Sequence, residues 1–289
     1  MVMEVGLGVP KRYPAVAGYF YESDPARLRR QIEQCFTSGH GPGSIPSRGG
    51  TGPPTVLISP HAGYMYSGPV AAHGFSQASK GPPPKTVVVI GPNHHGEGTE
   101  VSIYPPGQWV TPLGEIDIDS ELANRIIEAS DLISMDEYSH VYEHSIEVQL
   151  PFIQYVFGRV RFVPICMLNQ SIEAAQHVGE ILAKVIDRLE DYLVIASSDF
   201  THYEPHEEAV RRDRAVIEKI LKLDIEGFYT EMRDKRATLC GYGAIGALLC
   251  YARLKGYTTP ILLKYATSGD TSGDKSSVVG YASIAFLRG

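Results

Sequence analysis

Three apolar runs of the sequence each lead directly into a polar, turn-prone segment that contains histidine. VLIS precedes PHAGYMYSG, VVVI precedes GPNHHGEG, and LVIA precedes SSDFTHYEPH. If these runs are strands of one α/β sheet, their carboxyl ends form the edge at which such sheets bind ligands. We therefore expect His61, His94 or His95, and His202 in one polar crevice suited to a transition-metal ion.

The adjacent pair His94–His95 leaves one choice open, because neighbouring side chains normally point apart and only one of the two is expected to face the crevice. A single histidine in such a loop is more often exposed or bonded to a backbone carbonyl than a ligand. The other histidines do not follow strands in this way, and we interpret them as surface or structural residues: His40, His73, His140, His177 and His206.

Two carboxylates lie close to these histidines in the sequence. Asp199 stands three residues before His202, a spacing at which it can orient the imidazole or bind the same ligand; the alternative is a helix or turn cap. Glu143 and His144 open a helical pattern at Ser145. A capping role is the favoured interpretation there, with His144 able to point at the sheet edge.

Cys240 stands just before a strongly apolar helical segment, ATLCGYGAIGALL. A thiolate near a helix N-terminus is favoured by the helix dipole, and the thiolate is the metal-binding and nucleophilic form. A buried, inert thiol is the alternative, and it describes Cys35 and Cys250 better. No C-x-x-C pair occurs among the four cysteines, so reduced thiols are expected.

Glycines 241, 243 and 246 match the G-x-G-x-x-G pattern of dinucleotide-binding folds. No convincing strand precedes them and no acidic residue follows at the expected distance, so close helix packing is the simpler interpretation. No G-x-S-x-G elbow or P-loop is present. Ser197, Asp199 and His202 are too close in sequence to be taken as a hydrolase triad.

The elements that must position these residues alternate along the chain. The predicted strands are Thr55–Ser59, Thr86–Ile90, Arg161–Pro164, Tyr192–Ala196, Ile261–Tyr265 and Ser277–Phe286. The predicted helices are Pro25–Phe36, Pro69–Ser79, Asp119–Ala129, Ser145–Val156, Ile172–Leu189, Glu207–Leu221, Ile225–Arg233 and Gly243–Leu254. This alternation predicts one α/β domain over residues 1–289, with a largely parallel or mixed sheet between two helix layers.

The composition excludes several classes of partner. The net charge is -7 and no long Lys/Arg cluster occurs, which argues against nucleic acid or an anionic membrane. No segment has the length and apolarity of a signal peptide or membrane span, so a cytoplasmic location is expected. A small molecule or a peptide is the expected ligand.

Taken in order, PHAGYMYSG, GPNHH, EHSIEVQLP, SSDFTHY and LCGYGAIG resemble the signature blocks of the Memo family. The opening RYPAVAGYFY and the closing YATSGD and SSVVGYASIAF resemble that family too, so the match covers nearly the whole chain. The resemblance implies the fold of class III extradiol ring-cleavage dioxygenases. Those enzymes hold non-heme iron with two histidines and a carboxylate.

The resemblance also implies roles for individual residues. It assigns the metal to His61, to His94 as the first histidine of the pair, and to Cys240 in place of the carboxylate. His202 matches the position of a second-sphere base, and His144 that of a pocket histidine. A thiolate is softer than a carboxylate, so iron or copper is expected before zinc, and ring cleavage is less favoured.

Three functions follow from these residues. The first is metal-dependent redox or oxygen chemistry on a small molecule, or metal handling, with His202, Asp199 and His144 moving protons or orienting the substrate. The second is a binding module that captures a peptide or aromatic ligand in the same crevice without catalysis. The third is a zinc hydrolase, because two histidines, a cysteine and water form an open catalytic zinc site.

Overall fold

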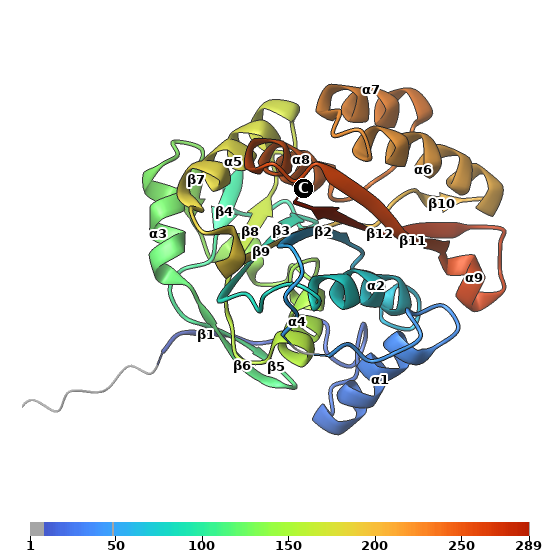
Figure 1. The fold of residues 1–289 in the computed structure, drawn as a ribbon, viewed down its shortest axis with the longest axis horizontal. Coiled ribbons are helices and arrows are strands. Elements are labelled where there is room, and N and C mark those ends of the chain that lie inside the picture. Colours follow the sequence, from blue (N-terminus) through green and yellow to red (C-terminus); the bar gives the residue numbers. More distant parts are fainter. Residues whose placement is uncertain (1–8, 48, 289) are drawn as a thin grey trace, which may run out of the picture.

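The computed structural model describes residues 9–47 and 49–288. Their strands form one mixed sheet in the order β1-β5-β6-β8-β3-β9-β2-β12-β10 (Figure 1). Its centre consists of parallel neighbours: β8 (Arg161–Met167), β3 (Thr86–Pro92), β9 (Tyr192–Ser197) and β2 (Thr55–Ser59). The predicted α/β fold with a mixed central sheet is confirmed.

Helices cover both faces of this sheet, as Figure 1 shows. One layer contains α3 (Ser120–Glu128), α5 (Ile172–Val185), α6 (His206–Ile220), α7 (Ile225–Lys235) and α8 (Tyr242–Lys255). The other contains α1 (Pro25–Thr37), α2 (Gly68–Ala78) and α4 (Leu150–Phe157). Val88 and Ile90 of β3 pack into the first core, and Val87 and Val89 into the second. Two buried faces explain why the VVVI run shows no polar alternation.

Some predicted boundaries shift. The segment expected to be helical from Ser145 begins as a 3-10 turn, η2 (Glu147–Gln149), and continues as α4. The Ser145 carbonyl accepts the Ser197 hydroxyl, and the N–H of Gln149, four residues on, is bonded to Ile146 instead, so no α-helical turn begins at Ser145. The helix from Ile172 ends at Val185, and a second 3-10 turn, η3 (Leu189–Asp191), leads into β9.

Several short elements were not predicted from the sequence. They are β1 (Lys11–Arg12), β4 (Val101–Ile103), β5 (Gln108–Thr111), β6 (Gly114–Ile118), β7 (Ile133–Met135), β10 (His202–Glu204), η1 (Tyr138–His140) and α9 (Ser268–Ser272). Most are too short to show a period, and their pairing is set by tertiary contacts. The two last strands, β11 (Thr259–Thr267) and β12 (Val278–Leu287), are antiparallel and extend the sheet beyond β2.

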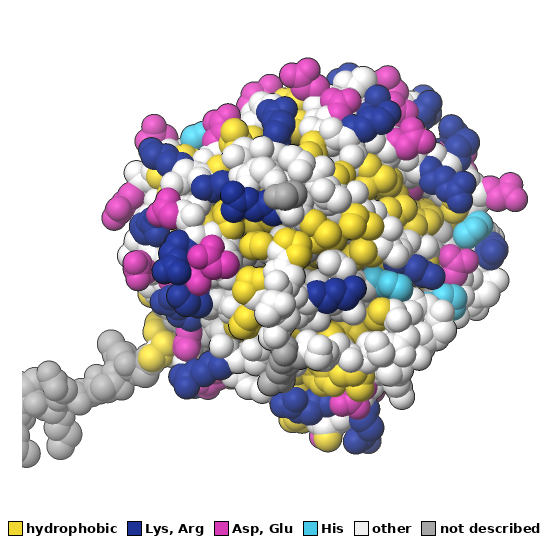
Figure 2. Space-filling view, viewed as in Figure 1, with side chains coloured by type: hydrophobic (Ala, Val, Ile, Leu, Met, Phe, Trp, Pro, Cys, Tyr) yellow, Lys and Arg dark blue, Asp and Glu magenta, His cyan; other side chains and the backbone are white. Residues whose placement is uncertain are grey.

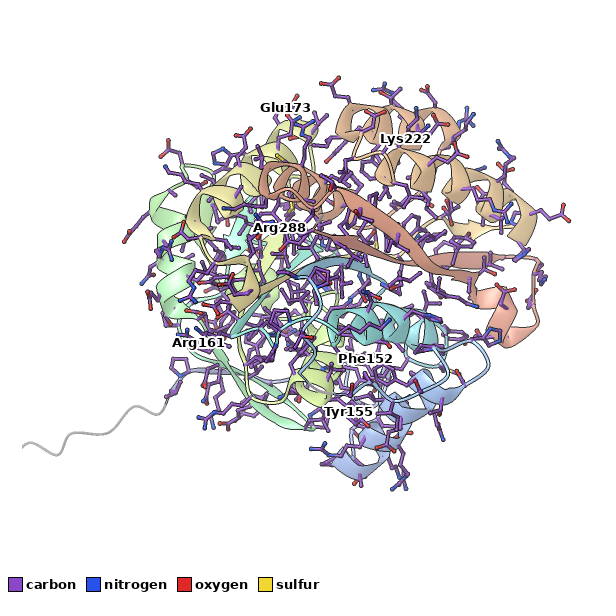
Figure 3. The ribbon with its side chains drawn as sticks, viewed as in Figure 1. Phe152, Tyr155, Arg161, Glu173, Lys222 and Arg288 are labelled. Carbon is purple, nitrogen blue, oxygen red and sulfur yellow. The ribbon has the colours of Figure 1, made fainter. Side chains whose placement is uncertain are left out.

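Aromatic side chains hold α4 against α1 and α2 (Figure 3). Phe152 stacks on Phe75 with 5.0 Å between ring centroids and meets Phe36 edge-on at 5.7 Å. Tyr155 also stacks on Phe36, with 6.1 Å between the ring centroids. Because α4 continues directly from residues 143–149, this packing fixes the segment that carries Glu143 and His144.

Acidic and basic side chains are mixed on the face of the molecule seen in Figure 2, without a large basic area. This distribution agrees with the net charge of -7. Across the part of the chain that the structure describes, no helix combines the length and apolarity needed to cross a bilayer.

Candidate metal centre

The histidine-bearing segments meet because their strands are neighbours. The sheet order places β9 between β3 and β2, all parallel, so the chain leaves all three strands at one edge. His61 follows β2 and His94 follows β3, while Cys240 enters from the segment before α8. Ligand atoms of these three residues all lie within 4.8 Å of one another.

His61 is the most buried member of the cluster, with 1% of its surface exposed. Its Nδ1 lies 2.9 Å from Ser197 Oγ, and its Nε2 lies 3.2 Å from Cys240 Sγ. Its backbone N–H donates to Asp199 Oδ1 at 2.8 Å. Burial holds the pKa of His61 well below its usual value. The imidazole is therefore neutral, which is the form that binds metal.

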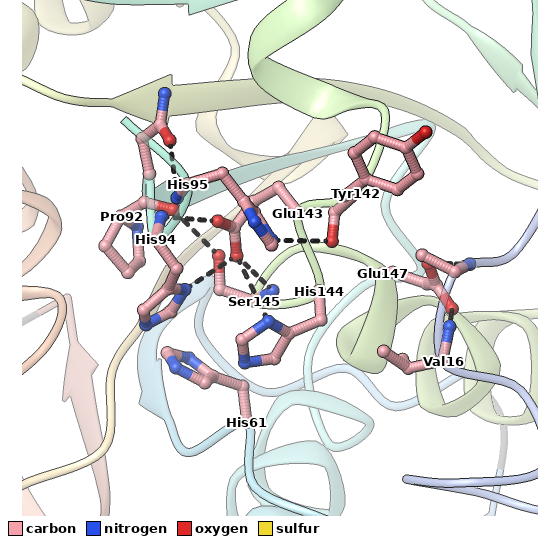
Figure 4. Close-up of polar contacts among 12 residues, drawn as sticks. Val16, His61, Pro92, His94, His95, Tyr142, Glu143, His144, Ser145 and Glu147 are labelled. Carbon is pink, nitrogen blue, oxygen red and sulfur yellow. Dashed lines mark hydrogen bonds and ion pairs between the residues drawn. The ribbon is translucent and has the colours of Figure 1, made fainter. Parts of the chain in front are cut away.

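His94, not His95, turns toward this cluster (Figure 4). Its Nδ1 lies 2.9 Å from Glu143 Oε1, and its backbone N–H donates to Glu143 Oε2 at 2.7 Å. A carboxylate acceptor at Nδ1 leaves Nε2 free for a metal. The His95 ring instead lies 3.0 Å from the backbone oxygen of Tyr142, on the exposed side of the loop.

The thiol of Cys240 behaves differently from the expectation based on the helix dipole. Burial, reinforced by the nearby Asp199 charge, raises the pKa of this thiol above its usual value. The N–H of Asp199 donates to Sγ at 3.2 Å, which favours the thiolate but does not outweigh the loss of solvation. A bound cation would supply the missing stabilisation and displace the thiol proton.

His144 lies against both other histidines, as Figure 4 shows. Its ring stacks on His94 with centroids 4.6 Å apart and meets His61 edge-on at 5.5 Å. Phe20, from the N-terminal segment, contacts it from another side at 4.9 Å. Burial lowers the pKa of His144 to about 4, so this ring is also neutral near pH 7.

Glu143 has the capping role favoured from the sequence and a second role that was not predicted. It accepts the backbone N–H of Ser145 at 2.8 Å, as a cap does, and it also holds His94. Burial on its own raises the pKa of Glu143, but the hydrogen bond from His94 brings it well below the usual range. Glu143, His94 and His144 also form a cluster with metal-like spacing. Because three N–H groups already occupy the Glu143 oxygens, we interpret it as a support for His94.

Asp199 and His202 do not form the expected pair. The Asp199 carboxylate accepts the N–H of His61 rather than a proton from the His202 ring, and so holds the turn after β2. Burial raises the pKa of Asp199 to about 6. His202 begins β10, where its Nδ1 lies 2.8 Å from the carbonyl of Thr238. It is close enough to influence the pKa values of His61 and Asp199.

The residues interpreted as structural have partners outside the cluster. Four of the remaining histidines bond a backbone oxygen or a hydroxyl: His73, His140, His177 and His206. Cys35, Cys166 and Cys250 are buried free thiols. A Cβ on Gly246 would lie 2.9 Å from Ala175 Cβ, and one on Gly243 would lie 2.9 Å from Gln170, so close packing accounts for these glycines.

Two supporting residues were missed by the sequence analysis. Ser197 entered it only as a rejected triad member, and Gln149 was taken as part of a helix. Both are buried and both contact the His61 side of the site: Gln149 Nε2 donates to Ser197 Oγ at 2.8 Å. The signals in the sequence were a glutamine ahead of an apolar helix, a serine that ends an apolar strand, and the position of both within the blocks EHSIEVQLP and SSDFTHY.

The donor set fits a transition-metal ion. The imidazoles of His61 and His94 have their Nδ1 atoms anchored, by Ser197 and by Glu143, and a thiol faces His61. Ligands at roughly 2.0–2.3 Å from one ion lie between about 3 and 4.5 Å apart, and the 3.2 Å between His61 Nε2 and Cys240 Sγ falls in that interval. Three protein ligands leave positions open for a further molecule.

Comparisons with known proteins show the family of this chain. The model of the Memo-like protein family matches residues 12–285. A MEMO1 family protein of Methanothermobacter thermautotrophicus is 49% identical over 95% of this chain and 99% of its own length. One from Sulfolobus acidocaldarius is 48% identical, again over 95% and 99%.

The fold also resembles a solved structure. An uncharacterized protein from Escherichia coli K12 superposes with a TM-score of 0.52 over 80% of this chain and 99% of its own, at 14% identity. That likeness concerns the fold alone. The family model and the near full-length relatives carry the assignment: this chain belongs to the Memo family.

Proposed function

We propose that this Memo-family protein binds one iron or copper ion through His61, His94 and Cys240. The ion would serve redox or oxygen chemistry on a small molecule, or would itself be the cargo. The observation that carries the proposal is the convergence of the three ligand atoms within 4.8 Å, with the Nδ1 atoms of both imidazoles anchored by hydrogen bonds. A thiolate favours a soft or redox-active metal over a hard one.

Bound there, iron or copper would supply electron transfer and an open coordination position. The chain's own residues would handle binding and protons. Burial lowers the pKa of His144 to about 4, so this ring stays neutral near pH 7 and can accept a hydrogen bond from a ligand at the centre. His202, half-buried and anchored through Nδ1 to Thr238, presents its Nε2 as a second acceptor or donor. Asp199 holds the His61 turn.

Metal analysis of the reduced protein, purified without oxygen, tests the proposal. We expect close to one iron or copper per chain in the wild type and loss of that metal in Cys240→Ala. Cys250→Ala is the matched control, because it removes a buried thiol from α8 without touching the centre. A wild-type protein that neither contains nor takes up iron or copper would contradict the proposal.

A zinc hydrolase remains the second candidate, because three protein ligands with an open position also describe catalytic zinc. The same metal analysis separates the two. Stoichiometric zinc with ester or amide hydrolysis, and no redox activity, would select the hydrolase.

A peptide-binding role has one structural observation in its favour. Tyr142 and Tyr203 are exposed, by 64% and 79%, directly beside Glu143 and His202. Such rings offer contact area to a peptide or aromatic ligand. Peptide binding that survives His61→Ala, together with the absence of metal, would favour this function over the metal-dependent one.

A further inference from the structure

We infer that Ser197 and Gln149 form a positioning relay that holds His61 in its Nδ1-protonated tautomer, so that Nε2 is the atom available to a metal. The inference deepens the proposed function, on which its metal-affinity part rests. The tautomer itself follows from hydrogen bonds of the protein alone.

The hydroxyl of Ser197 donates its proton to one acceptor, the backbone carbonyl of Ser145. Ser197 Oγ lies 2.7 Å from the backbone carbonyl oxygen of Ser145. A carbonyl has no proton to donate, and two oxygens at this distance need a proton between them. The Ser197 hydroxyl therefore donates to Ser145. Its remaining contacts must then be made as an acceptor.

Gln149 is one of the groups that donate to this hydroxyl. Its Nε2 lies 3.0 Å from the carbonyl oxygen of Pro60 and 2.8 Å from Ser197 Oγ. A flipped amide would place Oε1 against the Pro60 carbonyl, which can only accept, so the orientation of the amide is settled. Both N–H protons of Gln149 are thus used, one on the residue before His61 and one on Ser197.

The third contact of Ser197 determines the state of His61. The His61 Nδ1 lies 2.9 Å from Ser197 Oγ, whose own proton is already committed to Ser145. His61 must therefore be the donor, and Nδ1 carries the proton. The lone pair is left on Nε2, which lies 3.2 Å from Cys240 Sγ. The tautomer that binds metal through Nε2 is in place before any metal arrives.

Burial makes this arrangement hard to replace. Ser197, Gln149 and His61 have 0%, 1% and 1% of their surface exposed, so bulk water does not compete for these protons. The three residues come from β9, η2 and the turn after β2; β2 pairs with β9, and Gln149 of η2 is bonded to both Pro60 and Ser197. Loss of such supporting hydrogen bonds typically weakens metal binding about 10- to 100-fold.

The tautomer can be read directly in the metal-free protein. The wild-type chain, labelled with ¹⁵N-histidine and stripped with a chelator, is recorded by long-range ¹H–¹⁵N NMR, and His61→Gln identifies the His61 signals. We expect a protonated Nδ1 and a bare Nε2. A protonated Nε2 with a bare Nδ1 would overturn the inference, whatever the metal content.

Cobalt(II) affinity tests the consequence. Ser197→Ala should weaken Co(II) binding about 10- to 100-fold. The matched control is Ser59→Ala: Ser59 is the register partner of Ser197 on β2, is equally buried, and its hydroxyl has no partner among the described residues. It should change the affinity by less than about threefold. Equal affinities of wild type and Ser197→Ala would overturn the inference. If the wild type shows His61 protonated at Nδ1 but binds no metal, the positioning relay is supported and the proposed function is contradicted.

Discussion

Cys240 Sγ lies 3.2 Å from Nε2 of His61, although 179 positions separate the two residues in the chain. Burial raises the pKa of the Cys240 thiol and lowers that of the His61 imidazole, so burial disfavours both the thiolate and the imidazolium in the metal-free protein. A metal ion must therefore displace a proton to bind. Several measurable properties depend on this contact and on the groups around it.

Metal affinity should rise with pH. Because burial raises the pKa of the Cys240 thiol, the thiol is protonated across the neutral range and each bound ion releases one proton. His61 adds no second proton, since its pKa is lowered. The dissociation constant for Co(II) should fall about tenfold per pH unit between about pH 6 and about pH 8. Chelator competition measures it, and a flat wild-type profile would show that the thiolate is not a ligand.

Glu143→Gln should weaken metal binding about 10- to 100-fold, because an amide has one oxygen where the carboxylate accepts both His94 N–H groups. Glu147→Gln is the matched control. That carboxylate is equally buried but pairs with Arg12 at 2.8 Å. Glu147→Gln should lower the urea concentration at the midpoint of unfolding. Its affinity for Co(II) should stay within about threefold of the wild-type affinity. Similar losses of affinity in both variants would argue against a specific role of Glu143.

Gly246→Ala should destabilise the protein by about 1–3 kcal/mol, because the added methyl would lie 2.9 Å from both Ala175 Cβ and the Tyr229 hydroxyl. Gly39→Ala, where nothing lies within 4 Å, should change the free energy of unfolding by less than about 0.5 kcal/mol. Urea unfolding measures both. Equal stability of the two variants would contradict the close-packing interpretation of this glycine.

His140 should make stability depend on pH. Burial lowers its pKa to about 3, so the folded protein holds this ring neutral where the unfolded chain protonates it. Its stabilising contribution is complete above about pH 6.5 and is lost as the pH falls. Between about pH 6.5 and about pH 5, the free energy of unfolding of the wild type should fall by about 1.5 kcal/mol more than that of His140→Gln. Parallel losses in the two proteins would show that His140 titrates normally.

Much of the fold could be predicted from local pattern. The VVVI run is apolar at every position because both faces of β3 are buried, and the histidines that follow β2 and β3 reach one edge because parallel strands end together. The short strands, such as β4 and β7, have too few residues to show an alternation of apolar and polar side chains. Their pairing depends on neighbours far along the chain.

The detailed chemistry of the site depended on contacts between distant segments. The resemblance favoured His94 over His95, and the contact with Glu143 gives the physical reason for that choice. Only the burial of Cys240 reverses the effect expected from its place before α8. Ser197 and Gln149 lie within the blocks SSDFTHY and EHSIEVQLP, but the blocks alone do not show which groups these side chains contact. Hydrogen-bond direction and desolvation depend on three-dimensional surroundings, whereas strand burial and residue order are properties of the local sequence.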